Sequence, residues 1–250
     1  MKVLAIAAHP DDETIFAGGF LAKLAEDGHD LTLLMVTRGE GGEVGVPPVG
    51  PKSNLGEYRE REVRGAAAAL GARDIRFLGY TDPSIEIGEA PLPIPVSLEE
   101  FASSIAREMA EIRPDLVITH GTDGEYGHPQ HVYTHRATRE ALRKLAPWRP
   151  AQFLSWSANG GVNAEDRLTN RNDPATFVLD ISPWFEKKVA AAECHVSQHD
   201  LFKRNSQVER VRDMVRRVEA FRQWDWEELL SAEPEPHVAK ATSDWTDAYQ

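Results

Sequence analysis

The 250-residue sequence contains a single cysteine, Cys194. One thiol cannot form an intramolecular disulfide, and cysteine-rich zinc sites need several thiolates, so the sequence excludes a disulfide scaffold and a site of that kind. Low cysteine usage is typical of a reducing compartment, and we predict a cytoplasmic location. We interpret Cys194 as a small buried residue rather than a nucleophile, because no basic activator is evident apart from its neighbour.

Positive charge and long apolar runs are also scarce. The chain has 28 Lys and Arg against 40 Asp and Glu, a formal net charge of −12. Proteins that bind nucleic acid irrespective of its sequence need clustered cations, so the composition argues against that class. The first apolar run, residues 3–8, is too short for a signal peptide or a membrane span, and later runs are also too short. We therefore expect a soluble protein with no nucleic-acid and no membrane partner.

The apolar pattern predicts alternating strands and helices. Residues 3–8 are typical of a strand buried on both faces, residues 15–27 have helical spacing, and residues 31–37 indicate a second strand. This β-α-β unit implies a parallel pair of strands with a right-handed crossover. Further strands are predicted at 75–79, 116–119, 153–156 and 176–179, and further helices at 58–70, 98–112, 132–145, 183–194 and 202–221.

This alternation predicts an α/β protein with a Rossmann-like open, mostly parallel sheet and helices on both faces. The length and the 41% of hydrophobic residues fit one domain, which we expect over residues 1–232, with a peripheral C-terminal extension over 233–250. In such sheets ligands bind beyond the carboxyl ends of the strands. We therefore expect the loops after Ala8, Thr37 and Thr119 to meet around a ligand.

The first of these loops carries the motif His9-Pro-Asp-Asp-Glu13. Pro10 suits the first position of a helix, because its φ is fixed and it has no N–H to leave unpaired. The three carboxylates would then lie in the first turn, where the helix dipole favours negative charge. Taken alone, the motif is explained equally well as an acidic helix start and as a functional site.

A second loop concentrates histidine. Four of the nine histidines fall within residues 120–135. His9 and Asp12 are three residues apart, as are His128 and His131, so each pair can lie on one face of a helical turn. Two imidazoles and one carboxylate with an open fourth position make a catalytic Zn²⁺ site, and the same donors can bind Fe²⁺, Mn²⁺ or Co²⁺. The two loops together therefore favour a catalytic metal site.

With these motifs the sequence resembles the PIG-L/LmbE-like N-acetylglucosaminyl de-N-acetylase family. The resemblance spans about residues 1 to 200. The matching segments are His9-Pro-Asp-Asp-Glu13, Thr37-Arg-Gly-Glu-Gly41, Arg59-Glu-Arg-Glu62, Leu78-Gly-Tyr-Thr-Asp82, Gly127-His-Pro-Gln-His131, and Lys188 with His195-Val-Ser-Gln198.

The resemblance implies a zinc-dependent hydrolase that removes acetyl groups from N-acetyl amino sugars, often N-acetylglucosamine conjugates. It also implies roles for individual residues. Three of them would bind the metal: His9, Asp12 and His131. Asp11 would be the general base, and His128 would stabilise the oxyanion or protonate the leaving amine.

The same resemblance implies contacts with the substrate. Tyr126 matches a mobile tyrosine that can close on the tetrahedral intermediate. Arg59 and Asp82 match substrate-contacting positions, and Arg38 and Glu40 lie in the matching loop after the second strand. From the residues alone, Arg59 could equally belong to a solvated helix face paired with neighbouring glutamates.

One position departs from the family pattern. Gln130 stands where the second histidine motif commonly has an aspartate that orients and charges the neighbouring histidine. We therefore expect the pKa of His128 to be raised less than in such relatives, with another carboxylate taking over this role. Asp123 and Glu125 are the candidates, on the ground of their proximity in sequence.

Two rival functions remain open. One is a related metal amidase that cleaves a larger thiol-sugar amide with the same ligands but different pocket loops at 40–56 and 82–97. The other is a nucleotide-binding Rossmann domain without hydrolytic activity. Against it, the motif Gly-x-Gly-x-x-Gly is missing after the first strand, and acids there would repel a pyrophosphate. The expected partner is a small N-acetyl sugar, and the resemblance is compatible with a homo-oligomer.

Overall fold

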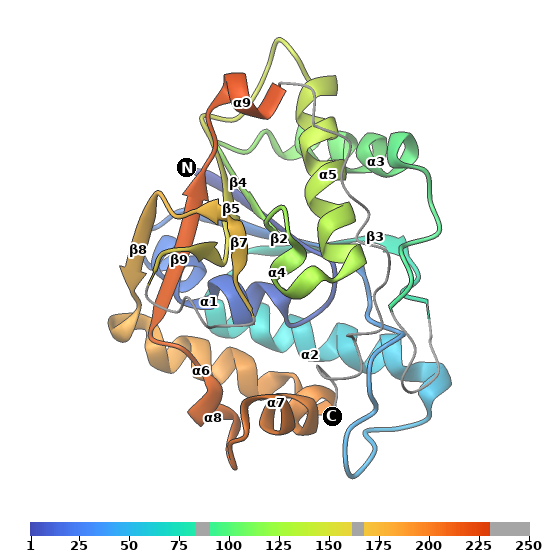
Figure 1. Ribbon diagram of the computed structural model, residues 1–250. Coiled ribbons are helices and arrows are strands. Elements are labelled where there is room, and N and C mark those ends of the chain that lie inside the picture. The colour runs from blue at the N-terminus through green and yellow to red at the C-terminus, as the bar shows by residue number, and fades with distance from the viewer. Residues whose placement is uncertain (84–90, 162–167, 231–250) are drawn as a thin grey trace.

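The computed structural model describes residues 1–83, 91–161 and 168–230, in which strands and helices alternate along the chain (Figure 1). The strands are β1 (Lys2–Ala7), β2 (Asp30–Thr37), β3 (Asp74–Tyr80), β4 (Leu116–Thr119), β5 (Gln152–Trp156), β6 (Ala158–Asn159), β7 (Asn170–Pro174), β8 (Phe177–Asp180) and β9 (Val218–Gln223). The helices are α1 (Asp12–Glu26), α2 (Leu55–Leu70), α3 (Leu98–Ile112), α4 (Gly124–Gly127), α5 (Pro129–Lys144), α6 (Phe185–Cys194), α7 (His199–Ser206), α8 (Val211–Met214) and α9 (Trp226–Leu230). Short 3-10 turns are η1 (Lys52–Asn54), η2 (Ser182–Trp184) and η3 (Val196–Gln198).

A seven-stranded sheet in the order β3-β2-β1-β4-β5-β9-β8 forms the centre of the molecule. Strands β1 to β5 pair in parallel, and β9 runs antiparallel to both β5 and β8. The predicted Rossmann-like open, mostly parallel sheet is confirmed. The extension expected over 233–250 lies outside the described residues.

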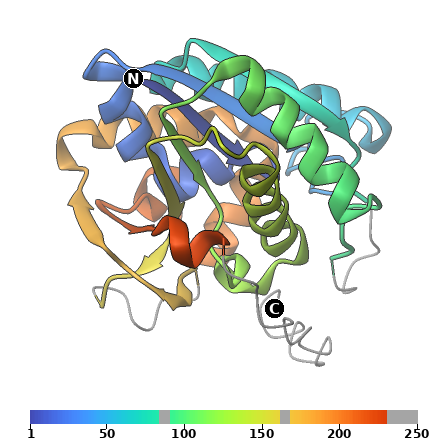
Figure 2. The same ribbon diagram turned by 90° about the horizontal axis from the view of Figure 1, so that it is seen from above.

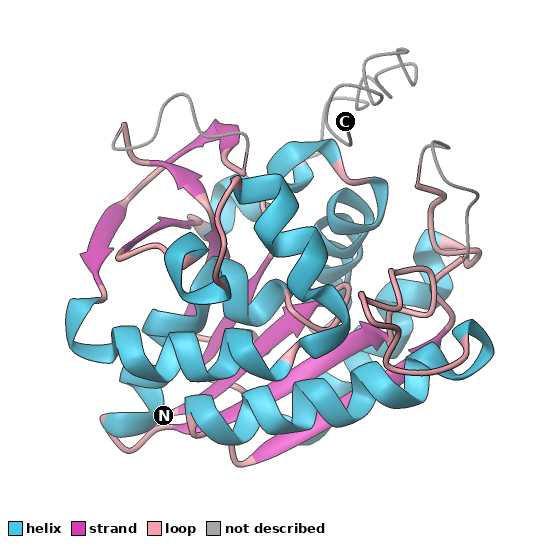
Figure 3. Cartoon of the chain, turned by 90° about the horizontal axis from the view of Figure 1, so that it is seen from below, coloured by secondary structure: helices cyan, strands magenta, loops and turns pink. Residues whose placement is uncertain are grey.

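Helices cover both faces of the sheet. Figures 1 and 2 show α3 and α5 together on one side, whereas α1, α2 and α6 lie on the other; Figure 3 shows helices crossing the strands from below. Side chains of β1 alternate between the two layers: Val3 and Ala5 pack with α1 and α2, and Leu4 and Ile6 pack with α3 and α5. The central strand is thus buried on both faces, which explains its continuous apolar run.

The helix predicted over residues 202–221 is wrong. Helix α7 ends at Ser206, where Gln207 adopts a left-handed φ of 54°, and the chain continues through α8 into strand β9. The side chains of Glu219 and Phe221 both point inward on this strand, and Phe221 joins the core beside β5. Pairing with β5 and β8 decides the conformation here, because an extended chain at this place forms backbone hydrogen bonds with both neighbouring strands.

Strand β9 also brings a carboxylate into the interior. Glu219 Oε1 lies 2.7 Å from Lys188 Nζ, and both side chains are 2% exposed. The same carboxylate accepts hydrogen bonds of 2.8 Å from the backbone N–H groups of Gly19 and Phe20. This buried ion pair therefore ties α1, α6 and β9 together.

We expect Lys188→Met to lower the free energy of unfolding by about 3–5 kcal/mol, because it leaves the buried Glu219 carboxylate without its counter-charge. Urea denaturation followed by circular dichroism measures the change. Lys187→Met is the matched control, because the side chains of Lys187 and its partner Glu26 are 44% and 57% exposed, and we expect a much smaller change in stability. Equal stabilities of the two variants would contradict this prediction.

In the described ranges, no helix is both long enough and apolar enough to cross a membrane.

Candidate active site

Three loops meet at the carboxyl ends of β1, β2 and β4, as the sequence predicts. The backbone carbonyl of Ala8 accepts hydrogen bonds from the N–H and the hydroxyl of Thr37, at 3.1 and 2.9 Å. The N–H of Ala8 donates to His120 Nε2 over 3.0 Å. These bonds hold the ends of the three strands in register around the residues that follow.

The acidic motif forms a sharp turn before α1. The helix begins at Asp12 rather than at Pro10, so the predicted helix start is wrong by two residues. Asp11 has φ 115° and ψ −32°, and its N–H donates to Glu13 Oε2 over 3.1 Å. Such backbone conformations cost roughly 1–3 kcal/mol and cluster at functional sites. The turn lets the side chains of Asp11 and Asp12 point to different partners.

Three predicted metal ligands converge on one point. Asp12 lies 3.3 Å from His9 Nδ1 through Oδ2 and 3.3 Å from His131 Nε2 through Oδ1, and the two nitrogens are also 3.3 Å apart. All three residues are buried. Donor atoms arranged tetrahedrally at about 2.0–2.1 Å from a Zn²⁺ ion lie about 3.3 Å from one another. The residues therefore fit a divalent cation.

Hydrogen bonds orient both imidazoles for this role. His131 Nδ1 lies 2.6 Å from Glu125 Oε2, and His9 Nε2 lies 2.9 Å from Gln130 Oε1. Since both partners are acceptors, we assign the ring protons to His131 Nδ1 and His9 Nε2. The opposite nitrogens, which face Asp12, then carry the lone pairs that a cation needs.

The charges of the ligand group complement one another. Burial lowers the pKa of His9, but the carboxylates of Asp82 and Asp12 outweigh this effect and raise it to about 9. Burial opposes ionisation of Asp12, but the neighbouring histidines, His131 first, hold its pKa well below the usual value. A cation that binds between these groups displaces the proton of His9.

Glu125 is a site residue whose actual role the sequence did not indicate. Besides His131 it holds His120, whose Nδ1 lies 2.9 Å from Glu125 Oε2. Burial favours the neutral acid, but the contacts with His120 and His131 prevail and lower the pKa of Glu125 to about 2. Asn170 Oδ1 in turn accepts from the N–H of Glu125 over 2.9 Å. The inward direction depends on a left-handed φ of 61° at Glu125, which no sequence pattern indicates.

His120, Glu125 and His131 also offer three donor atoms close together. Their atoms are already committed to one another, and the remaining nitrogen of His120 accepts from the N–H of Ala8. This group is therefore a hydrogen-bonded support for His131 rather than a second cation site.

The carboxylates expected to serve His128 have other partners. Glu125 binds His131 and His120, and Asp123 accepts from the backbone N–H and the side chain of Asn172, at 2.9 and 2.8 Å. That prediction is wrong because α4 is a single irregular turn, which directs Glu125 inward and Asp123 toward β7.

His128 is arranged as a neutral donor. Its Nδ1 accepts from the N–H of Gln130 over 3.3 Å and caps α5, which assigns the ring proton to Nε2. Burial, with His131 and His9 close by, holds the pKa of His128 well below its usual value. The ring of Tyr126 packs edge-on at 5.7 Å from the ring of His128, so the predicted catalytic side chains are neighbours.

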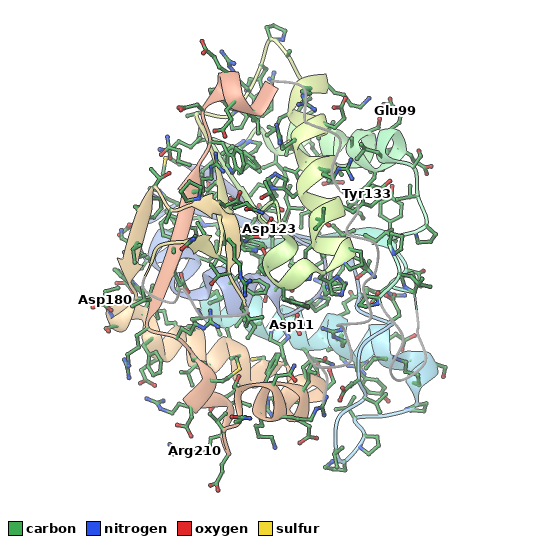
Figure 4. All side chains as sticks on the ribbon, viewed as in Figure 1. Asp11, Glu99, Asp123, Tyr133, Asp180 and Arg210 are labelled. Carbon is green, nitrogen blue, oxygen red and sulfur yellow. The ribbon has the colours of Figure 1, made fainter. Side chains whose placement is uncertain are left out.

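Asp11 lies next to the candidate metal ligand Asp12 and pairs with Arg59. The guanidinium is 3.2 Å from Asp11 Oδ2 and also donates to the backbone carbonyls of Pro10 and Gly39. Burial raises the pKa of Asp11 to about 6, and Arg59 limits the rise. The Arg59 side chain is 4% exposed, so it does not belong to a solvated helix face. Figure 4 marks Asp11 near the centre of the molecule, close to the entry into α1.

The other predicted substrate contacts form a chain of hydrogen bonds at the rim. Asp82 Oδ2 accepts from the N–H of Gly41 over 3.0 Å, and the N–H of Asp82 donates to Glu40 Oε2 over 3.1 Å. Arg38 Nε lies 3.2 Å from Glu40 Oε1, and its side chain is 42% exposed. The loop after β2 is thereby fastened to the turn after β3, with Arg38 facing solvent.

The sequence profile of the PIG-L family, described as GlcNAc-PI de-N-acetylase, matches residues 4–142, more than half of the chain. The chain belongs to the PIG-L family. The predicted enzyme class, an N-deacetylase that hydrolyses a linear amide, is thereby confirmed, and a nucleotide-binding domain without hydrolytic activity is not supported.

Relatives of this PIG-L protein include a 1D-myo-inositol 2-acetamido-2-deoxy-alpha-D-glucopyranoside deacetylase from Thermobifida fusca. The two are 31% identical over 238 residues, which cover 79% of this chain and 83% of the relative.

Solved structures confirm the fold. An N,N'-diacetylchitobiose deacetylase from Pyrococcus horikoshii matches with a TM-score of 0.65 and 22% identity, over 95% of this chain and 88% of the other. A 4-carboxy-2-hydroxymuconate hydratase from Pseudomonas putida matches with a TM-score of 0.63 and 18% identity, over 94% and 98%. Because one fold carries both reactions, the fold by itself does not identify the substrate.

Proposed function

We propose that this PIG-L protein is a metal-dependent deacetylase that removes the acetyl group from an N-acetylglucosamine-type sugar conjugate. Its cation, with Zn²⁺ the first choice, would be held by His9, Asp12 and His131. The observation that carries the proposal is the close approach of three buried residues: the two imidazole nitrogens lie 3.3 Å apart, and each lies 3.3 Å from one oxygen of the Asp12 carboxylate. When bound there, a divalent ion supplies Lewis-acid polarisation and lowers the pKa of a water molecule.

Asp11 is the base in this proposal. Its carboxylate lies next to the ligand Asp12 in the chain but pairs with Arg59, so it stays outside the ligand set. With a pKa of about 6 it is ionised at neutral pH and still able to take a proton from an attacking water. Arg59 would keep the carboxylate pointed at the site rather than contact the sugar.

In this proposal His128 and Tyr126 act on the oxygen of the substrate's amide. With its proton on Nε2, neutral His128 donates a hydrogen bond to the amide oxygen as negative charge develops there. This arrangement favours oxyanion stabilisation by His128, whose pKa is held low. The proton that Asp11 takes from the water would then pass to the leaving amine as the C–N bond breaks. Tyr126, which packs against both His128 and His131, is placed to add a second donor.

The name of one relative supports the proposed substrate class. The Thermobifida fusca protein is named for an acetamido sugar linked to inositol, and the Pyrococcus horikoshii enzyme for a chitobiose. We propose that Arg38, Glu40 and Asp82 line the entrance for the sugar. The cytoplasmic location and a homo-oligomeric state stay predictions.

A substrate panel tests the proposal. The protein is stripped with a chelator, titrated with Zn²⁺, and assayed for acetate release from an N-acetylglucosaminyl inositol, N,N'-diacetylchitobiose and free N-acetylglucosamine. A larger thiol-sugar amide completes the panel. We expect turnover of at least one N-acetyl conjugate that depends on the cation. Turnover of the thiol-sugar amide alone would favour the amidase alternative, and a lack of both cation binding and turnover would refute the proposal.

A further inference from the structure

Gln130 has every polar atom of its side-chain amide engaged. Its Oε1 lies 2.9 Å from His9 Nε2, and its Nε2 donates to Asp82 Oδ1 over 2.8 Å and to the carbonyl of Leu92 over 2.9 Å. The residue is 1% exposed. Two acceptors, Asp82 Oδ1 and the Leu92 carbonyl, lie on one side of the amide, so the NH₂ group has to face them. The amide oxygen then faces His9 Nε2.

We propose that Gln130 is a positioning residue which, anchored by Asp82, holds the His9 imidazole in the tautomer and orientation that present Nδ1 to the cation. This inference rests on the proposed function, because it assumes that His9 is a metal ligand. It assigns to Gln130 a task on His9, whereas the residue that it replaces in the family pattern was expected to act on His128.

The surroundings explain why an amide suits this position. A carboxylate at residue 130 could accept from His9, but its second oxygen would face Asp82 Oδ1 and the Leu92 carbonyl, which are both acceptors. Two carboxylates in contact in a buried site repel each other unless one is protonated. An amide accepts on one side and donates on the other, so it joins His9 to Asp82 without adding charge.

Asp82 extends the connection to the rim. Its second oxygen accepts from the N–H of Gly41 in the loop after β2. The direct distance from His9 Nε2 to Asp82 Oδ1 is 3.9 Å, longer than either hydrogen bond through Gln130. The position of a metal ligand is thus coupled to the loop that we expect to contact the sugar, and Gln130 is the link.

The dissociation constant of Zn²⁺, measured by competition with a chromophoric chelator on the stripped protein, tests this role. Gln130→Met keeps the side-chain volume but cannot accept from His9. We expect it to weaken Zn²⁺ binding by about 10–100-fold, the usual effect of losing a partner of a metal-ligating histidine. Gln130→Ala serves as a second variant if the methionine does not fold. Gln152→Ala is the control, because Gln152 is exposed at the amino end of β5.

A double-mutant cycle separates action through Gln130 from a direct effect of Asp82 on His9. Asp82→Ala alone should weaken Zn²⁺ binding by less than about 10-fold, because it removes the anchor of Gln130 and a carboxylate near His9 but no ligand. In the Gln130→Met background the same change should have a smaller effect, because only the direct charge effect of Asp82 on His9, at 3.9 Å, is then left. Equal effects of Asp82→Ala in both backgrounds would overturn the link.

Nitrogen-15 NMR of the zinc-loaded protein gives a second measurement, the exchange rate of the proton on His9 Nε2. If Gln130 only stabilised the fold, its replacement would leave this rate unchanged. In the wild type, His9 Nε2 should carry a slowly exchanging proton; in Gln130→Met that proton should exchange faster. If the wild type binds Zn²⁺ and Gln130→Met binds it equally well, this inference fails and the proposed function stands. If the wild type binds no divalent cation, the proposed function itself fails.

Discussion

Asp11→Asn is expected to lower kcat by about 10²–10⁴-fold, the usual contribution of a general base, while the zinc content of the purified protein stays at the wild-type level. An amide cannot take a proton from the attacking water. It is nearly isosteric with the carboxylate, and asparagine tolerates positive φ better than most residues, so the strained turn should be kept. Steady-state acetate release and metal analysis on the same preparation measure the two quantities.

The environment of Asp11 makes this a sharp test. Arg59 can still donate to the amide oxygen of the substituted side chain, and the backbone carbonyls of Pro10 and Gly39 keep their bonds to the guanidinium. Asp27→Asn, at the other end of α1, is the matched control and should leave kcat unchanged. Wild-type turnover in Asp11→Asn would exclude Asp11 as the base, and loss of zinc would place it among the ligands instead.

His131→Ala is expected to abolish both zinc binding and turnover. The substitution removes one of three donor atoms and leaves Glu125 without the imidazole that it orients. The affinity for Zn²⁺ should therefore fall by more than the roughly 10–100-fold that loss of an outer partner costs. Equilibrium dialysis followed by metal analysis measures the loss.

His29→Ala is the matched control for His131→Ala, because His29 lies in the turn after α1, at the amino end of β2. It should bind Zn²⁺ as tightly as the wild type. Retention of the wild-type zinc content in His131→Ala would contradict the ligand set proposed here, whatever the effect on turnover. Melting temperatures of the stripped proteins show whether each variant is folded.

The parallel half of the fold was predictable because its strands, apart from the edge strand β3, are buried on both faces. A strand such as β1, with Val3 and Ala5 in one layer and Leu4 and Ile6 in the other, has to be apolar throughout. The antiparallel part was not predictable in the same way. Residues 218–223 show a pattern compatible with a helix, and only the adjacent β5 and β8 make them a strand.

The candidate site was also predictable only in part. The chemical identity of the donors follows from the sequence, because His9 and Asp12 lie one turn apart and the carboxyl ends of β1 and β4 must face the same side of a parallel sheet. Family resemblance assigned roles to Asp11, His128 and His131. The roles of Glu125 and Gln130 did not follow. That of Glu125 depends on an irregular turn, and that of Gln130 depends on contacts with His9 and Asp82, which are distant in the chain.

The sequence by itself indicated which residues could bind a cation and at which edge of the sheet they gather. Only the tertiary structure decided which nitrogen of each imidazole faces that cation. The reason is physical: the tautomer of His9 depends on an acceptor 121 residues away, on Gln130, and that of His131 on a carboxylate directed inward by an irregular turn. Hydrogen bonds of this kind exist only after the chain has folded, so the sequence holds the donors and the fold assigns their protons.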